Sequence, residues 1–234
     1  MNKPNAGARA GARRRAPRLK PGVKKEQIVE VAVDYFGRYG YEETKWADIA
    51  AAVDIGSTAL YHYFESKQHC LFEIMATAVQ EFHDRFDRIT AAHDDWADAL
   101  LAVLVDQFDL TEQEVLRNRV LVAEMGLLGV KRELPREEAA RAGAREQIRS
   151  LEAGWVSFLT RGIREGQLPE NDPVLLTRAL LGLYNSAFQW YRPDGALSID
   201  KLGRYFVARE LAVIGAAAEL EARIDAVAAE AEAR

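Results

Sequence analysis

The sequence has a single cysteine, Cys70, among 234 residues. One cysteine cannot form a disulfide within the chain, which favours a reducing compartment, so we expect a cytoplasmic protein. The sequence also has no apolar run of the eighteen or more residues that a membrane-spanning helix needs. No apolar stretch follows the basic N-terminus, so we expect neither a secretory signal nor a membrane partner.

The usual signatures of enzymes are missing as well. There is no glycine-rich phosphate loop and no set of His and Cys residues at metal-ligand spacing. His69 and Cys70 are adjacent, which places them on different faces of a helix and argues against a nucleophile–base pair. We therefore expect no enzyme, no catalytic residue, no metal and no cofactor.

Acidic residues are absent from the first 25 positions, which hold nine basic residues. The remaining 22 basic residues face all 36 acidic ones, so an acidic body follows a cationic arm. This asymmetry is typical of a protein whose one end binds a polyanion, although a solvated tail is the simpler alternative. Residues 1–22 are rich in Ala, Gly, Pro and Arg, and we expect them to be unstructured when free.

Nearly all of the chain after residue 22 has helical periodicity, with no strand alternation and no internal repeat. We predict an all-α protein. Glycine, proline and capping residues divide the pattern into expected helices at 23–39, 44–53, 57–63, 66–89, 95–109, 111–128, 135–166, 172–191 and from 198 onward. Thr44 is the expected N-cap of the second helix, and Asp54 is expected to adopt a left-handed turn.

Two short helices joined by a four-residue break, 44–53 and 57–63, predict a helix-turn-helix. In this motif the second helix enters the major groove, while the first lies across the DNA backbone. Leu60 and Phe64 are expected to hold the inner face of the second helix to the core; the alternative is a small core helix with surface tyrosines. The predicted DNA-binding residues of the motif are Thr44, Lys45 and Trp46 at the start of the first helix, Ser57, Thr58 and Ala59 at base edges, and Tyr61, His62, Tyr63 and Lys67 at phosphates.

Residues 24–72 resemble the N-terminal domain of the TetR family of bacterial repressors. The family pattern T-x-x-x-I-A-x-x-A-G-V-S-x-G-T-L-Y-x-Y-F-x-S-K-x-x-L is matched here at Thr44, Ile49, Ala50, Leu60, Tyr61, Tyr63, Phe64, Ser66, Lys67 and Leu71. The sequence departs from it in the turn, with Asp54 for Gly, Gly56 for Ser and Ala59 for Thr. These departures leave the fold in place and put the base preference in doubt.

The resemblance implies a nine-helix protein that dimerises through its last two helices and carries a ligand pocket in each C-terminal body. Ligand binding would respace the two reading heads and release a palindromic operator. The chain is therefore expected to divide into a basic arm at 1–22, which the family pattern does not cover, a DNA-binding domain at 23–68, and a ligand-binding and dimerisation domain at 69–234. The arm arginines Arg13, Arg14, Arg15 and Arg18 are then expected to contact DNA.

The last two helices carry an apolar pattern that suits a homodimer. The helix at 172–191 is apolar nearly all round, and the last helix has a seam of apolar residues at spacings of seven, four and three. Burial within one subunit is the alternative. The predicted interface residues are Leu176, Leu180, Leu183, Phe206, Val213 and Leu220.

The segment WYRPDGALS, 190–198, resembles one from a TetR branch that controls lipid and steroid breakdown and answers to acyl-CoA thioesters. A small apolar effector, such as an acyl-CoA, is therefore expected, with Arg192 near a phosphate; the alternative is that Arg192 is an ordinary surface arginine. The alternative function is a helical lipid or acyl-CoA carrier that binds no DNA. The rings expected to line the pocket, each of which could instead be plain core, are Phe82, Phe86, Phe108, Trp155, Phe158, Tyr184 and Phe188.

Overall fold

A computed structural model describes residues 21–216, and these residues form nine α-helices and one short 3₁₀ helix, with no strand among them. This confirms the all-α prediction. The elements are α1 (Pro21–Tyr39), α2 (Trp46–Ala52), α3 (Ser57–Leu60), α4 (Lys67–Ala92), α5 (Trp96–Asp106), α6 (Glu112–Glu124), η1 (Met125–Gly129), α7 (Pro135–Arg164), α8 (Pro173–Trp190) and α9 (Ile199–Ile214). The predicted arm residues Arg13, Arg14, Arg15 and Arg18 lie outside the described residues, as does Leu220.

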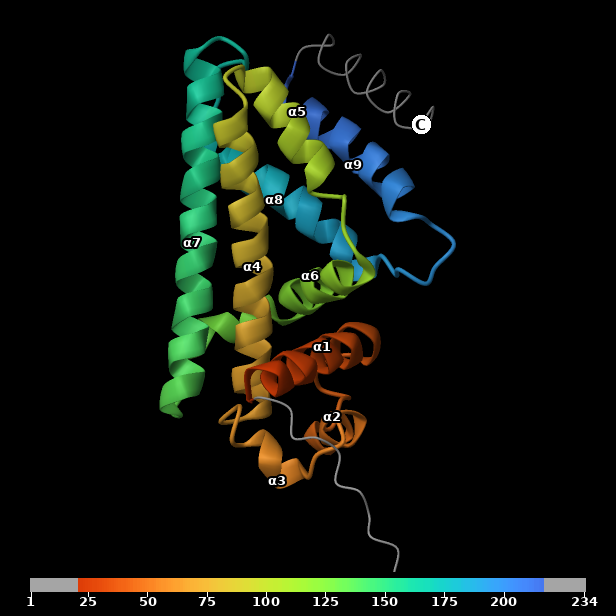
Figure 1. The fold of residues 1–234 in the computed structure, drawn as a ribbon. Helices are drawn as coiled ribbons and strands as arrows, with labels where there is room; N and C mark the ends of the chain where they lie inside the picture. The colour runs from red at the N-terminus through yellow and green to blue at the C-terminus, as the bar shows by residue number, and fades with distance from the viewer. Residues whose placement is uncertain (1–20, 217–234) are drawn as a thin grey trace, which may run out of the picture.

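Helices α1, α2 and α3 form a head at one end of the molecule, and α4 runs from this head into the larger body (Figure 1). The long helix α7 packs along α4, and α5, α8 and α9 gather at the far end of the body. Helix α6 lies between the head and α8, and it contacts both. One continuous set of buried apolar side chains extends from Ile28 in the head to Ile214 at the end of α9.

Local capping residues set most helix boundaries where the sequence predicts them. Gly40 ends α1 with φ +96°, and Ser66 caps α4 by accepting a hydrogen bond from the His69 amide at 2.9 Å. Thr111 and Glu114 form a reciprocal capping box at the start of α6. Asp172 and Ser198 cap α8 and α9 as expected.

The prediction that Thr44 caps α2 is wrong. The N-cap of α2 is Lys45, which makes no side-chain capping bond. The Thr44 hydroxyl instead donates to the Gly40 carbonyl at 2.8 Å, close to the Tyr35 carbonyl at 3.3 Å. It satisfies the carbonyls left over at the end of α1, because these lie nearer than the first turn of α2.

Helix α9 is shorter than its apolar pattern predicts. Gly215 adopts a left-handed conformation with φ +68° and ends the helix after Ile214. Leu176, Leu180 and Phe206, expected at a dimer interface, are buried within the subunit, so those assignments are wrong. An apolar pattern indicates only that a side chain is shielded from water. Packing in the core of one subunit shields it as well as contact with a partner subunit does. Leu183 is half-buried and Val213 is 45% exposed.

Across residues 21–216, no helix combines the length and the apolar character needed to span a bilayer.

Candidate nucleic-acid interface and apolar cavity

The turn between α2 and α3 is built on Asp54, whose φ of 53° makes it the one non-glycine residue with positive φ among residues 21–216. The Ile55 amide donates to the Ala50 carbonyl at 3.0 Å, and the Asp54 amide to the Ala51 carbonyl at 3.1 Å. This pair of bonds is a Schellman motif, which ends α2 and turns the chain sharply. Aspartate tolerates the left-handed region, so the missing glycine leaves the predicted turn intact.

Helix α3 ends at Leu60 and is shorter than the expected 57–63, and residues 61–63 follow it as a hydrogen-bonded turn. Leu60 and Phe64 are fully buried and attach this segment to the head. The opposite face is open: Ser57, Thr58 and His62 are exposed, and Tyr61 is 55% exposed. Hydroxyl and ring donors on a protruding short helix fit a major groove and its flanking phosphates.

The other predicted DNA contacts divide by burial. Lys45 is exposed at the start of α2, whereas Ala59 and Tyr63 are half-buried beside the open face. Trp46 is half-buried with its ring 6.1 Å from that of Phe64, so most of its indole supports the head. Lys45 thus joins Ser57, Thr58, Tyr61 and His62 as the side chains available to a ligand outside the protein.

Thr44 and Lys67 face inward, contrary to the expectation that they contact DNA. Thr44 is only 4% exposed, and its carbonyl accepts a hydrogen bond from Lys67 Nζ at 2.7 Å. The Lys67 ammonium also lies 4.0 Å from the centroid of the Tyr41 ring, and desolvation lowers its pKa. These contacts hold the loop before α2 against the start of α4, so both residues shape the interface from behind.

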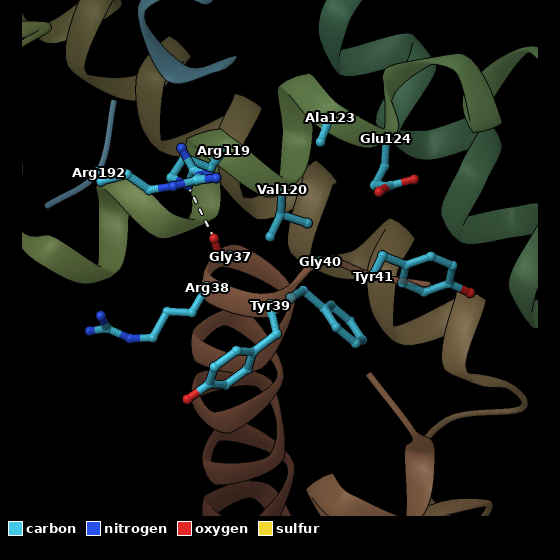
Figure 2. Close-up of a pocket in the computed structure, with 11 residues that line it drawn as sticks. Gly37, Arg38, Tyr39, Gly40, Tyr41, Arg119, Val120, Ala123, Glu124 and Arg192 are labelled. Carbon is cyan, nitrogen blue, oxygen red and sulfur yellow. Dashed lines mark hydrogen bonds between the residues drawn. The ribbon is translucent and has the colours of Figure 1, made fainter. Parts of the chain in front are cut away.

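Helix α6 is the joint between head and body. A Cβ atom on Gly37 would lie 2.8 Å from the Leu116 Cβ, so only glycine allows α1 and α6 to approach this closely. Arg119 of α6 donates through Nε to the Gly37 carbonyl at 3.1 Å (Figure 2). Its Nη1 donates to the Phe188 carbonyl at 3.3 Å and to the Tyr191 carbonyl. One guanidinium therefore links the C-terminal ends of α1 and α8.

A second face of α6 lines an apolar cavity of about 90 Å³ between α4, α6, α7 and α8. Of the residues predicted to line a pocket, Phe82 and Tyr184 are in its wall. Arg192 lines a different hollow of about 150 Å³, the one beside Arg119 and the end of α1 (Figure 2). The remaining wall residues include Val79, Leu121, Val122, Met125, Ile148, Leu151 and Leu181.

Five of the predicted pocket rings are core residues instead. Phe86, Trp155 and Phe158 pack together, with 4.9 Å between the Phe86 and Trp155 centroids. Phe108 and Phe188 pack against Tyr184, with ring centroids 5.5 and 4.9 Å from that of Tyr184. The number of rings suggested a cavity, but aromatic side chains more often fill the core than line a cavity, and these five are buried in the core.

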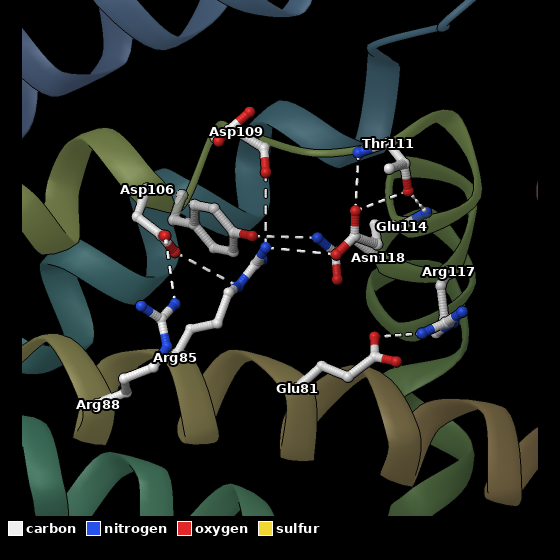
Figure 3. Close-up of polar contacts among 10 residues, drawn as sticks. Glu81, Arg85, Arg88, Asp106, Asp109, Thr111, Glu114, Arg117 and Asn118 are labelled. Carbon is white, nitrogen blue, oxygen red and sulfur yellow. Dashed lines mark hydrogen bonds and ion pairs between the residues drawn. The ribbon is translucent and has the colours of Figure 1, made fainter.

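Three polar residues of the wall were not predicted as site residues from the sequence: Asn118, Glu152 and Asn185. Asn118 donates through Nδ2 to the Tyr184 hydroxyl at 3.0 Å, and burial raises the pKa of Tyr184 (Figure 3). The only available signal was the position of Asn118 and Asn185 on otherwise apolar helix faces.

Figure 3 also shows the ion pairs that tie α6 to α4, Arg85 with Glu114 at 3.3 Å and Arg117 with Glu81.

The outer surfaces of α8 and α9 expose large apolar side chains. Leu175 is 59% exposed, Trp190 53% and Tyr205 58%. On α8 the exposed positions between them include the small residues Ala179 and Gly182. We call Leu175, Ala179, Gly182 and Trp190 of α8, together with Tyr205 and Val213 of α9, the outer apolar face.

Comparison with known families matches two regions of the chain. Residues 28–74 match the model of bacterial regulatory proteins of the tetR family, and residues 93–214 match the tetracyclin repressor-like C-terminal domain. The first region spans the head and the second contains α5 to α9.

Individual relatives are similar over most of their length. The HTH-type transcriptional repressor KstR2 of Mycolicibacterium smegmatis is 24% identical over 189 residues, which is 80% of this chain and 89% of KstR2. The structure of the ketosteroid transcriptional regulator KstR2 of Mycobacterium tuberculosis superposes with a TM-score of 0.67 at 24% identity, covering 82% of this chain and 94% of that one. AibR in complex with isovaleryl coenzyme A and operator DNA gives a TM-score of 0.65 at 21% identity, covering 80% of this chain and 97% of AibR.

Proposed function

Because this chain belongs to the tetR family of bacterial regulatory proteins, we propose that it is a dimeric, ligand-responsive repressor that reads a palindromic operator with residues 57–63. The open face of Ser57, Thr58, Tyr61 and His62, held from behind by buried Leu60 and Phe64, is the observation that carries this proposal. A helical carrier without DNA binding is not favoured, because it gives this face no role.

The test begins with the genomic DNA fragments that the immobilised protein retains. The affinity of the protein for these fragments is then measured by fluorescence anisotropy at two salt concentrations. A repressor that contacts phosphates binds a defined fragment with a steep salt dependence. A carrier binds no fragment at either concentration, and that result would remove the proposal.

Replacing Tyr61 by phenylalanine should weaken operator binding by about thirtyfold, because each subunit of the dimer loses one phosphate-directed hydroxyl worth roughly 1 kcal/mol. The salt slope should stay the same, since no charge changes. Tyr39→Phe is the matched control: Tyr39 is 63% exposed at the far end of α1.

Replacing Ser57 or Thr58 by alanine should instead change the ranking of operator variants. Equal losses in Tyr39→Phe and Tyr61→Phe, with an unchanged ranking, would contradict the assignment.

For the effector, we propose a CoA thioester whose acyl group enters the apolar cavity. The resemblance of WYRPDGALS to acyl-CoA-responsive regulators and the isovaleryl coenzyme A bound by AibR support this class. Inside the cavity, Tyr184 accepts a hydrogen bond from Asn118, so its own proton is available to a thioester carbonyl. The burial that raises the Tyr184 pKa keeps that proton in place.

Entry of the acyl group would move α6. Pockets that hold small molecules usually measure about 300–1,000 Å³, well above the volume of this cavity, so the lining helices must separate. Helix α6 contributes Asn118, Leu121 and Val122 to the wall, and its adjacent residues Leu116 and Arg119 contact Gly37 at the end of α1. A displacement of α6 therefore reaches the head directly, which is how ligand binding would respace the two heads.

A panel of CoA thioesters should raise the melting temperature, because a ligand bound only by the folded state stabilises it. Tyr184→Phe should bind the best thioester about tenfold more weakly, since it loses one hydrogen bond to the carbonyl. Tyr205→Phe, on the exposed surface of α9, should bind like the wild type. A melting shift with another ligand class, and none with any thioester, would overturn this effector.

A further inference from the structure

The first turn of α7 lacks a cap of its own. Its N-cap is Leu134, whose side chain cannot accept a hydrogen bond, and Pro135 has no amide hydrogen. The next two amides, those of Arg136 and Glu137, both donate to Glu65 Oε2, at 2.8 and 3.1 Å. Glu65 is some seventy residues earlier in the chain, between α3 and α4. A carboxylate from the head thus caps a helix of the body, where the helix dipole favours a negative charge.

Two further hydrogen bonds join the same segments. Arg136 Nη2 donates to the Tyr63 carbonyl at 2.7 Å, and the Ser66 hydroxyl donates to Glu137 Oε2 at 2.5 Å. Glu137 is 6% exposed, so this contact is shielded from water. Residues 63–66, which directly follow the exposed turn with Tyr61 and His62, are therefore bonded at three points to the first turn of α7.

The backbone of Glu65 is itself fixed. Its amide donates to His69 Nδ1 at 3.0 Å, and His69 Nε2 lies 3.0 Å from a Glu73 oxygen. An Nδ1 that accepts a hydrogen bond carries no proton, so His69 is neutral here. Desolvation by burial lowers the His69 pKa, which favours the same state. Glu65 is consequently oriented from both its main chain and its carboxylate.

We propose that Glu65 is a positioning residue for operator recognition, because it fixes the reading turn at 61–63 to the start of α7. The inference rests on the proposed function, since it assigns Glu65 a role in how that turn meets DNA. Helix α7 also lines the apolar cavity at Ile148 and Leu151, which lie about 17 and about 21 Å along the helix from Glu137 at 1.5 Å per residue. The cap therefore connects the reading turn to a helix that a ligand would touch.

Glu65→Ala is expected to bind the operator about tenfold more weakly, because the reading turn loses its fixed position relative to the body. Binding to a random duplex of equal length should stay unchanged or become slightly tighter, since a negative charge near DNA has been removed. Glu65→Gln keeps an oxygen that can accept both amides, and it should remain within about threefold of the wild type.

Glu43→Ala is the matched control, because Glu43 is an exposed glutamate in the same head and the charge change is identical. This variant should match or slightly exceed the wild type on both duplexes. If Glu65→Ala behaves like Glu43→Ala while the wild type binds its operator, the positioning role is wrong and the proposed function stands. If the wild type binds no DNA, the proposed function fails instead.

A second variant covers the case in which Glu65→Ala does not fold. Arg136→Ala removes the donor to the Tyr63 carbonyl and leaves the amide cap, so operator affinity should fall about threefold while the melting temperature falls by only about 2–4 °C. Arg149→Ala removes the same charge from an exposed, ion-paired position on α7 and should bind the operator like the wild type. Equal affinity of Arg136→Ala and Arg149→Ala for the operator would also overturn the proposal.

Discussion

Gly182→Arg should convert the dimer into a monomer and lower operator affinity at least about a hundredfold, because a bivalent protein gains that much or more from holding two half-sites at once. Gly182 lies on the exposed side of α8, and a Cβ atom placed there would meet nothing within 4 Å. The folded subunit therefore accommodates the new side chain. The new arginine can disturb only a contact that another subunit makes with α8.

The outer apolar face explains why this position matters. Leu175, Trp190 and Val213 would each leave water in a dimer, while Ala179 and Gly182 would let a partner helix approach closely. An arginine between them holds the two helices apart and places a charge in the contact. Analytical ultracentrifugation measures the mass, and fluorescence anisotropy with the palindromic operator measures the affinity.

Gly143→Arg is the matched control for this experiment. Gly143 is exposed in the first third of α7, and a Cβ atom placed there would also meet no atom within 4 Å. The substitution adds the same charge and the same gain in helix propensity, about 0.8–1 kcal/mol relative to glycine, but lies outside the outer apolar face. A Gly182→Arg protein that sediments as a dimer and binds DNA like Gly143→Arg would show that the interface lies elsewhere.

The sequence predicted the helices well because their ends depend on local chemistry. Ser66, Asp172 and Ser198 cap their own helices, and Asp54 supplies a turn that few other residues could form. These effects act within four residues, so a sequence pattern contains all that they need. The same reason made the exposed face at 57–63 predictable, since Leu60 and Phe64 at a spacing of four set its inner side.

Contacts between distant segments could not be predicted in the same way. Lys67 suits a phosphate by residue type, yet its ammonium is taken by the Thr44 carbonyl and the Tyr41 ring. Phe206 fits a dimer seam by spacing, but its ring packs 5.9 Å from that of Phe108. Glu65 carries no local signal at all, because the amides that it caps belong to α7. Each outcome depends on which helix lies opposite, and helical periodicity does not specify that neighbour.

Removing residues 1–20 should weaken operator binding about 10- to 100-fold near 0.1 M salt and flatten its salt dependence, if three contacts per subunit are lost. These residues carry seven positive charges and no acid, and they lie outside the described part of the chain. They precede α1, which packs against α2 in the head. Six contacts per dimer correspond to a change of about 5 in the slope of log affinity against log salt concentration.

Substitution of Arg13, Arg14, Arg15 and Arg18 by glutamine separates charge from chain length. Because the electrostatic contribution depends on the number of phosphates neutralised, this full-length variant should lose most of the slope that the truncation loses. Preference among half-site variants should barely change in either protein, since phosphate contacts carry no direct sequence information. Arginines that enter a minor groove would add one exception, a reduced preference for A·T-rich flanks, where the groove is narrow and its potential most negative. If both variants keep the wild-type affinity and slope, the head alone accounts for DNA binding, and the basic residues serve only to keep the protein in solution.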